Sequence, residues 1–262
     1  LVTDISNTFL FDVTDELKLS SQLGVNTINN EYRRITGDND YSSLTTAYPI
    51  PAGKQKIFNY YLDNSLEYDI FKFDANLNLV DWKTSGIKGV CMEGNPYCSP
   101  KEAGNFSRKD TDLSYSLILS SKIDELFAPF VSYERTTRPL NVQELFTSGT
   151  VYEDINTMLK PETAKTYQIG FNSHKKGALR DGDFFGFKAT YYNTKIDNFI
   201  YDRIIGITNG NGNTTMFLAR LNDKATLKGF EIELLYDMDV FYVKASYTRQ
   251  KSSYQPSDSV SL

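Results

Sequence analysis

The chain has 262 residues and a formal net charge of −5, with a single histidine and two cysteines. This acidic balance excludes a nucleic-acid binder, which needs a basic face to displace counterions from phosphates. No stretch approaches 18 consecutive apolar residues, which excludes a transmembrane helix. A β-barrel leaves no such signal, because its apolar residues alternate with polar ones.

From the first residues onward, apolar side chains recur with a period of two rather than with the 3.6 period of a helix. We therefore expect about ten strands and no helix, and each strand is long enough to cross a membrane when tilted. In chain order the strands are expected at 4–13, 17–33, 56–69, 70–83, 110–122, 126–138, 162–174, 183–202, 214–237 and 239–251.

The expected connections alternate in length. Short ones fall at 14–16, 69–70, 122–125, 174–182 and 237–239, and long ones fall at 34–55, 84–109, 139–161 and 203–213. Short turns on one rim and long loops on the other are typical of an outer-membrane barrel, periplasmic and extracellular respectively. A soluble β-sandwich also alternates, but several strands here exceed the usual five or six residues. The polar face also carries charges such as Lys72, Glu231 and Lys244, which fits a water-filled lumen.

We therefore predict an all-β fold, an antiparallel transmembrane β-barrel segment in which residues 1–262 form one partial barrel domain. A plugged transporter barrel has about 22 strands, so about ten strands would supply somewhat under half of the wall. Because strand-like sequence already begins at Leu1, we expect a truncated chain from which the plug and the remaining strands are absent.

The two cysteines, Cys91 and Cys98, lie in the segment CMEGNPYC. The pair Asn95-Pro96 signals a turn, which could bring the two Cα atoms within bridging distance. We expect a disulfide, as suits an oxidising compartment, and two free thiols are the alternative. A metal site is disfavoured because no second pair of Cys or His residues exists to complete four ligands.

The segment from Phe127 to Asn172 carries a more specific pattern. Its elements, in order, are Tyr133 near the end of a strand, Arg138-Pro139, Glu144-Leu145-Phe146, Leu159-Lys160-Pro161-Glu162 and a strand through Tyr167 and Phe171. This order resembles the family of TonB-dependent outer-membrane receptors, and residues 184–201 and 227–237 resemble barrel strands of that family. The resemblance implies a bacterial outer-membrane transporter, surrounded by outer-membrane lipid, with no intrinsic cofactor and no enzyme activity.

The loop between the two prolines is the main candidate for ligand binding. Pro139 and Pro161 each remove a backbone donor, so strand pairing should stop at both. A loop of some twenty residues is usually functional or disordered. Our candidate ligand-binding residues are Arg138, Glu144, Phe146, Tyr152 and Met158. The alternative for Arg138 and Glu144 is that they merely fasten this loop to the barrel wall.

Within the family, haem receptors resemble this arrangement most, since there an Arg-rich Pro motif and an Asn-Pro-Asn-Leu motif bracket a haem-binding histidine. Here the brackets read TTRPLNVQELF and INTMLKPE, with no histidine between them. The single histidine, His174, is expected as a solvated residue in a short periplasmic turn. An axial ligand for haem iron would then have to be Tyr152, Met158 or a residue outside this chain, and the identity of any bound metal stays open.

The resemblance thus predicts uptake of an iron-bearing ligand, with haem or a haem protein preferred and a ferric siderophore as the alternative. Long loops also suit docking of a host iron protein. A TonB-type energy-transducing protein would act through the missing plug. The competing class is a non-transporting outer-membrane adhesin, for which loops alone could suffice. No serine can be placed beside a histidine base, and Glu231 and Glu233 are most simply polar wall residues.

Overall fold

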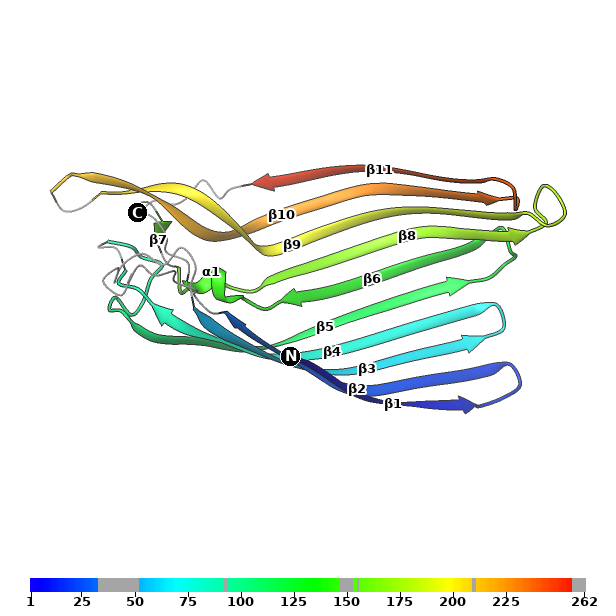
Figure 1. The fold of residues 1–262 in the computed structure, drawn as a ribbon, viewed down its shortest axis with the longest axis horizontal. Coiled ribbons are helices and arrows are strands. Elements are labelled where there is room, and N and C mark those ends of the chain that lie inside the picture. The colour runs from blue at the N-terminus through cyan, green and yellow to red at the C-terminus, as the bar shows by residue number, and fades with distance from the viewer. Residues whose placement is uncertain (33–51, 92–93, 147–152, 155, 209–210, 256–262) are drawn as a thin grey trace.

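The computed structural model describes residues 1–32, 52–91, 94–146, 153–154, 156–208 and 211–255. Ten strands lie side by side in chain order in one antiparallel sheet (Figure 1). They are β1 (Val2–Asp12), β2 (Leu17–Tyr32), β3 (Gly53–Tyr68), β4 (Phe71–Lys88), β5 (Gly104–Ser121), β6 (Ala128–Arg138), β8 (Glu162–Lys176), β9 (Phe184–Thr208), β10 (Thr214–Asp237) and β11 (Tyr242–Gln255). A two-residue strand, β7 (Glu153–Asp154), pairs in parallel with β10.

The connections fall on two rims of different character. The turns at 13–16, 69–70, 122–127, 177–183 and 238–241 all lie at the right of Figure 1, and the longer connections lie at the left. The connections 89–103 and 139–161 agree with the predicted long loops. The predicted long loop at 203–213 is wrong, because β9 continues to Thr208 and leaves a connection of five residues before β10. We call the two ends the turn rim and the loop rim.

The two faces of the sheet differ in chemistry. On β4, the odd-numbered residues from Phe71 to Leu79 are apolar, and all of them except the half-buried Ala75 are exposed. The strand register sets Leu79 beside Tyr60 on β3 and Leu113 on β5. On the opposite face, the amide of Asn59 donates to that of Asn78 at 3.3 Å. One apolar and one polar face are typical of a barrel wall. We call them the outer face and the lumen face.

The apolar part of the outer face has a limited height. From Phe71 to Leu79 it extends about 26 Å along the strand at roughly 3.3 Å per residue, and Asp81 follows. Aromatic rings lie along it at two levels. Nearer the loop rim, at the level of Ala75 and Leu77 in the register, Tyr133 lies 5.8 Å from Tyr115 and 4.7 Å from Tyr167 between ring centroids. At the lower end the rings of Phe127, Phe171 and Phe187 follow one another at 5.6 Å.

The expectation of no helix is wrong at one place, α1 (Val142–Phe146). The Asn141 side chain accepts a hydrogen bond from the Glu144 backbone at 2.9 Å, and the Glu144 carboxylate accepts one from the Asn141 backbone at 2.9 Å. This reciprocal pair is a capping box. Five residues are too few to show a helical period, and such a short helix depends on packing against the sheet. Within the described ranges, no helix is both long and apolar enough to cross a membrane.

One seam of the sheet is incomplete. Phe71 to Lys88 of β4 all pair with β5, whereas β5 pairs with β6 only from Tyr115 to Ser120. The part of β5 that is nearest the loop rim, from Gly104 to Ser114, therefore forms no backbone ladder with β6. This seam is where the loop between β6 and β8 leaves the wall.

Candidate functional site

The candidate site is built on the loop that joins β6 to β8, residues 139–161, which we call the β6–β8 loop. Residues 147–152 and 155 of it lie outside the described part of the chain. The ladder of β6 to β8 extends to the pair Arg138–Glu162 and ends there. Pro139 explains this end, because it lacks the backbone N–H that another step would need.

The first half of the loop, together with Leu159 from its second half, is buried against the lumen face. Leu140, Val142, Leu145, Phe146 and Leu159 have no exposed surface and form one cluster with Trp82 of β4. Burying each such side chain stabilises the packed loop by about 1.5–3 kcal/mol. Glycines make the wall flat beneath α1, because a Cβ at Gly53 would lie 2.9 Å from Val142 and one at Gly86 would lie 3.0 Å from Phe146. The described residues 140–146 of the loop are thus seated against the barrel wall.

Buried polar groups fix the point where the loop turns away from β6. The backbone carbonyl of Leu140 accepts hydrogen bonds from the Gln55 amide at 2.9 Å and from the Thr84 hydroxyl at 2.6 Å. Both side chains lie on the lumen face and are buried. Since an unpaired buried carbonyl is costly, these two contacts define the height at which Leu140 sits on the wall.

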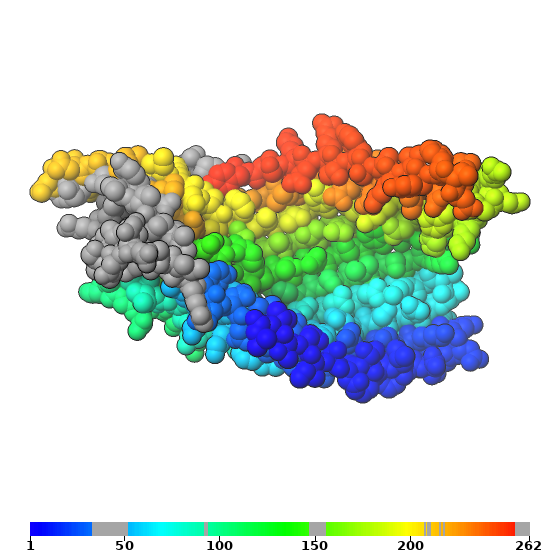
Figure 2. Space-filling model, in the orientation of Figure 1, coloured from blue at the N-terminus to red at the C-terminus, as the bar shows by residue number. Residues whose placement is uncertain are grey.

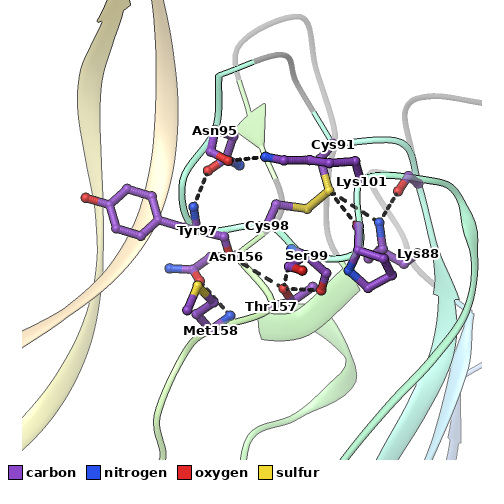
Figure 3. The surroundings of a disulfide bond; sticks show 12 residues. Lys88, Cys91, Asn95, Tyr97, Cys98, Ser99, Lys101, Asn156, Thr157 and Met158 are labelled. Atoms are coloured by element: carbon purple, nitrogen blue, oxygen red, sulfur yellow. Dashed lines mark hydrogen bonds between the residues drawn. A yellow bond between two sulfur atoms is a disulfide. The ribbon is translucent and has the colours of Figure 1, made fainter. Parts of the chain in front are cut away.

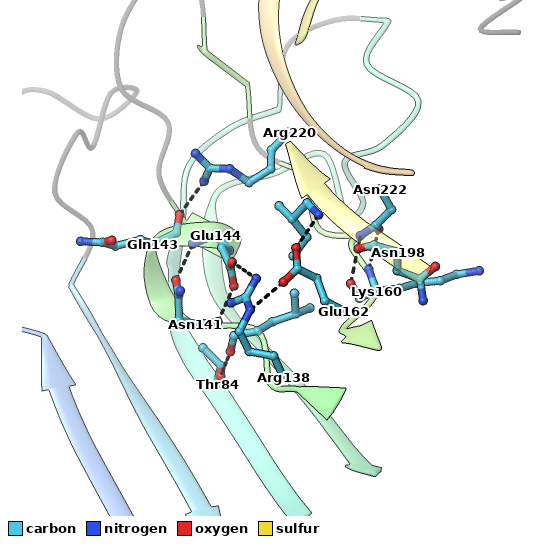
Figure 4. A network of polar contacts seen from close by, with 12 residues as sticks. Thr84, Arg138, Asn141, Gln143, Glu144, Lys160, Glu162, Asn198, Arg220 and Asn222 are labelled. Atoms are coloured by element: carbon cyan, nitrogen blue, oxygen red, sulfur yellow. Dashed lines mark hydrogen bonds and ion pairs between the residues drawn. The ribbon is translucent and has the colours of Figure 1, made fainter. Parts of the chain in front are cut away.

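Arg138 joins the two ends of the loop (Figure 4). Its guanidinium contacts Glu144 of α1 at 2.7 Å and Glu162, the first residue of β8, at 2.8 Å. The two carboxylates flank the guanidinium, so the three charges form one network of ion pairs. This geometry agrees with the alternative interpretation, in which Arg138 and Glu144 fasten the loop to the wall.

The second half of the loop is tied to a cysteine-containing segment (Figure 3). Cys91 and Cys98 form a disulfide with their Cα atoms 5.9 Å apart. Thr157 lies beside it, where its backbone N–H donates to Tyr97 at 3.1 Å and its hydroxyl accepts from the Ser99 backbone at 3.0 Å. Arg108 of β5 donates to the Thr157 carbonyl at 2.9 Å. Through these hydrogen bonds, residues around Thr157 occupy the position beside the loop-rim half of β5, where β6 does not pair with it.

The same half also reaches the far side of the wall. Asn156 donates to the Arg220 carbonyl of β10 at 2.6 Å, and the Asn222 side chain exchanges two hydrogen bonds with the Lys160 backbone, at 2.8 and 3.0 Å. The Arg220 guanidinium donates to the Gln143 carbonyl of α1 at 3.1 Å (Figure 4). The β6–β8 loop therefore connects β3–β5 with β9–β10 across the lumen face.

The predicted site residues have different surroundings. Arg138 and Glu144 bind each other, and Phe146 is fully buried, with its ring edge-on to Phe106 at 6.2 Å. Met158 is 56% exposed. Tyr152 lies outside the described residues. The expectation of His174 in a turn is wrong, because β8 continues past it to Lys176, and its backbone N–H donates to the Glu125 carbonyl near the turn rim.

Sequence reasoning missed the residues that position the loop from a distance. Gln55, Thr84, Asn156, Thr157, Arg220 and Asn222 carry no local motif, and their partners lie far away in the chain. Only the capping box was visible as a short pattern, Asn141 followed three residues later by Glu144.

Below α1 the lumen face is hollowed. A groove of about 360 Å³ has a mixed lining. Its polar side chains include Asn26, Asn59, Asn78, Ser114 and Glu134, and its apolar side chains include Ile28, Ile57, Val80 and Pro139. The side-chain amide oxygen of Asn59, Oδ1, is buried without a hydrogen-bond partner in the described structure. This part of the wall is therefore suited to polar contacts from within the lumen.

A curved antiparallel wall with an apolar outer face, a polar lumen face and a loop folded onto the lumen side defines an outer-membrane barrel. The family model "TonB dependent receptor-like, beta-barrel" matches residues 3–261, and the chain belongs to this family. Receptors of this family are bacterial outer-membrane transporters and not enzymes. They carry no intrinsic cofactor, and the haem or siderophore that they bind is cargo.

Two curated relatives come from Haemophilus influenzae. A probable TonB-dependent receptor is 29% identical over an alignment 297 positions long, which covers 98% of this chain and 32% of that protein. Heme/hemopexin utilization protein C is 29% identical over 161 residues, which cover 55% of this chain and 22% of that protein. The chain thus spans at most about a third of the length of these relatives.

Solved structures show the same fold. The hemophore receptor HasR of Serratia marcescens, solved with its hemophore and heme, matches with a TM-score of 0.78 and 20% identity over 95% of this chain and 41% of that one. The ferric-catecholate import receptor Fiu of E. coli K12 matches with a TM-score of 0.64 and 16% identity over 96% of this chain and 37% of that one.

Proposed function

We propose that the receptor containing this chain takes up an iron-bearing ligand across the outer membrane, with haem or a haem-carrying protein as its cargo. The observation that carries the proposal is the β6–β8 loop, which is fastened to both sides of the wall yet exposes Met158 near the loop rim. The preference for haem rests on the 29% identity to heme/hemopexin utilization protein C. The likeness to HasR supports the fold of such a receptor.

The loop offers chemistry that suits haem. A thioether and a phenolate are both known axial ligands of haem iron, and Met158 and Tyr152 are the two such side chains that we propose for contact with the cargo. We propose an indirect role for Arg138, Glu144 and Phe146: they hold the loop in position, because their contacts are with the wall and with each other. A loop held in place before binding loses less conformational entropy when the cargo arrives.

The rest of the uptake cycle follows from family membership. We propose that a TonB-type energy-transducing protein acts through a plug outside this chain, and that a host iron protein can dock on the loop rim. A ferric siderophore is the alternative cargo, as the shared fold with Fiu allows. A non-transporting adhesin is disfavoured by the family match.

The test is a haem titration of the full-length receptor in detergent, followed by the Soret band. We expect a saturable shift at micromolar or tighter haem, weakened about tenfold by Tyr152→Phe or Met158→Leu. Met216→Leu is the matched control, because Met216 of β10 is 52% exposed and no role in binding is proposed for it. The absence of any shift in the wild type would rule out free haem, and the titration would then be repeated with haem proteins and a ferric catecholate.

A further inference from the structure

Three lysines lie in direct register on neighbouring strands. Lys56 of β3 pairs with Lys83 of β4, which pairs with Lys109 of β5. All three are exposed and share the outer face with Phe58, Leu79 and Leu113. Neighbouring Cα atoms of paired strands are about 4.5–5.5 Å apart, so the three Cα atoms fall within roughly 10 Å of one another. We call these residues the lysine row.

The row is not explained by contacts within the described chain. Like charges directly opposite each other destabilise a sheet, and no described carboxylate lies within ion-pair distance of any of the three. The nearest outward acid along β4 is Asp81, which accepts a hydrogen bond from Thr111 at 3.4 Å. The chain as a whole is acidic, with a net charge of −5. A positive row in an acidic protein indicates an anionic partner.

The position of the row indicates which partner this is. Lys56 is the next outward residue above Phe58, and Lys83 and Lys109 lie two outward positions above Leu79 and Leu113. The same step from an apolar residue to a cation recurs on other strands, at Tyr133–Arg135, Tyr167–Lys165, Tyr191–Lys195, Phe230–Lys228 and Tyr247–Arg249. Of these, Lys165 is already paired with Asp197 at 2.8 Å, and Arg135 donates to the Leu113 carbonyl. Lys195, Lys228 and Arg249 make no described ion pair either. Within the described residues, the lysine row is the part of this border where three cations without an ion pair stand in direct register on neighbouring strands.

We propose that the lysine row binds the phosphate groups of an outer-leaflet lipid whose acyl chains lie on the apolar band below. Lysine side chains at the edge of an apolar band place their charge at headgroup level, and ammonium–phosphate hydrogen bonds are of the strong, charge-assisted kind. Lys83 also lines a groove of about 750 Å³ together with the outward residues Lys54, Ser85 and Ser107. Glu31 also lines this groove, with its carboxylate 3.7 Å from the Lys54 ammonium. Lys83 and the two serine hydroxyls are therefore the groups that we expect to meet a polar headgroup. This inference does not depend on the identity of the cargo.

The test uses the full-length receptor, delipidated in a non-ionic detergent, and a variant with Lys56→Gln, Lys83→Gln and Lys109→Gln. The probe is lipid A, a disaccharide lipid with two phosphates, added in mixed micelles and counted on the receptor by native mass spectrometry. The matched control removes three charges at the turn rim, by Lys122→Gln, Lys175→Gln and Lys176→Gln. A second triple variant, with arginine at the three positions of the row, restores the charge.

We expect the glutamine variant to bind lipid A at least tenfold more weakly than the wild type, and the arginine variant and the turn-rim control to bind normally. Without lipid the glutamine variant should melt no lower than the wild type, because removing like charges relieves repulsion. Added lipid should then raise the melting temperature of the wild type more than that of the variant. Equal binding by wild type and glutamine variant would overturn the proposal. So would equal binding of dephosphorylated lipid A, or equal thermal protection by inorganic phosphate alone.

Discussion

Arg138 shows how one side chain can set the geometry of a long loop. It lies where β6 ends and binds a carboxylate on each side of the loop, Glu144 and Glu162. The planar guanidinium presents several N–H donors in a fixed fork, which lets one residue satisfy two acceptors at once. Glu144 is at the same time the partner of Asn141 in the capping box. One residue pair therefore couples the start of β8 to the orientation of α1.

Replacing Arg138 by glutamine should loosen α1 without unfolding the barrel. Hydrogen bonds to charged groups contribute about 1.5–3 kcal/mol, and partial exposure of the guanidinium screens part of this. We expect hydrogen exchange at residues 142–146 to speed up by about 5- to 30-fold in the full-length receptor, with Arg138→Lys rescuing only partly. Unchanged exchange in both variants would contradict the fastening role.

At the turn rim, Asp183 organises the turn between β8 and β9. Its carboxylate accepts hydrogen bonds from the backbone of Ala178, Leu179 and Arg180 and from the Tyr236 hydroxyl. Burial raises the pKa of Asp183, but these four hydrogen bonds outweigh it and hold the pKa below its ordinary value. Such a group stabilises the folded turn above the unfolded-state pKa, and the stabilisation is lost as the pH falls through the folded-state pKa.

We therefore expect the 177–183 turn to be fully protected from hydrogen exchange at neutral pH and to lose protection below about pH 4. Asp183→Asn should lack this pH dependence and show weaker protection at neutral pH. Exchange measured between pH 3 and pH 7, after correction for the intrinsic rate, provides the check. A wild-type profile as flat as that of the variant would refute the assignment.

At the scale of elements, local sequence patterns predict where strands form, whereas contacts between distant residues decide how the loop is placed. Alternation of side chains predicted each of the ten strands. The spacing of Asn141 and Glu144 is compatible with a helix start, but α1 is too short to show a helical period and was not predicted. The upper ends of β4, β5 and β9 extend several residues beyond the prediction, because strand pairing continues above the apolar band where alternation fades. The positions of Thr157 and Asn156 could not be predicted, since their partners are set only by tertiary structure.

The disulfide should matter mainly for the second half of the β6–β8 loop. Closing a loop of this size removes unfolded-state freedom equivalent to about 2–3 kcal/mol, and Tyr97 and Ser99 inside or beside it bind Thr157 directly. Cys91→Ser with Cys98→Ser should increase exchange at residues 156–160 at least tenfold while residues 142–146 change little. Equal loosening of both segments would show that the loop moves as one unit.

At the scale of the whole molecule, the wall combines three layers of chemistry. The apolar outer face borders lipid, and the polar lumen face carries the groove below α1. The β6–β8 loop crosses the lumen face between β3–β5 and β9–β10. Figure 2 shows the strands in chain order along the wall. The sequence pattern predicted the layers and the rims, because both follow from alternation and turn length. It did not predict that β5 and β6 separate, since this depends on the residues around Thr157 that pack beside β5 in place of β6.

The most direct measurement of the proposed function is haem-dependent growth of a strain deleted for this receptor and complemented with the full-length protein. With haem as the sole iron source, we expect growth with the wild type, reduced growth with Met158→Leu or Tyr152→Phe, and none when the energy-transducing protein is removed. Haem binding without haem-dependent growth would contradict uptake. Growth that persists without the energy-transducing protein would contradict energised transport.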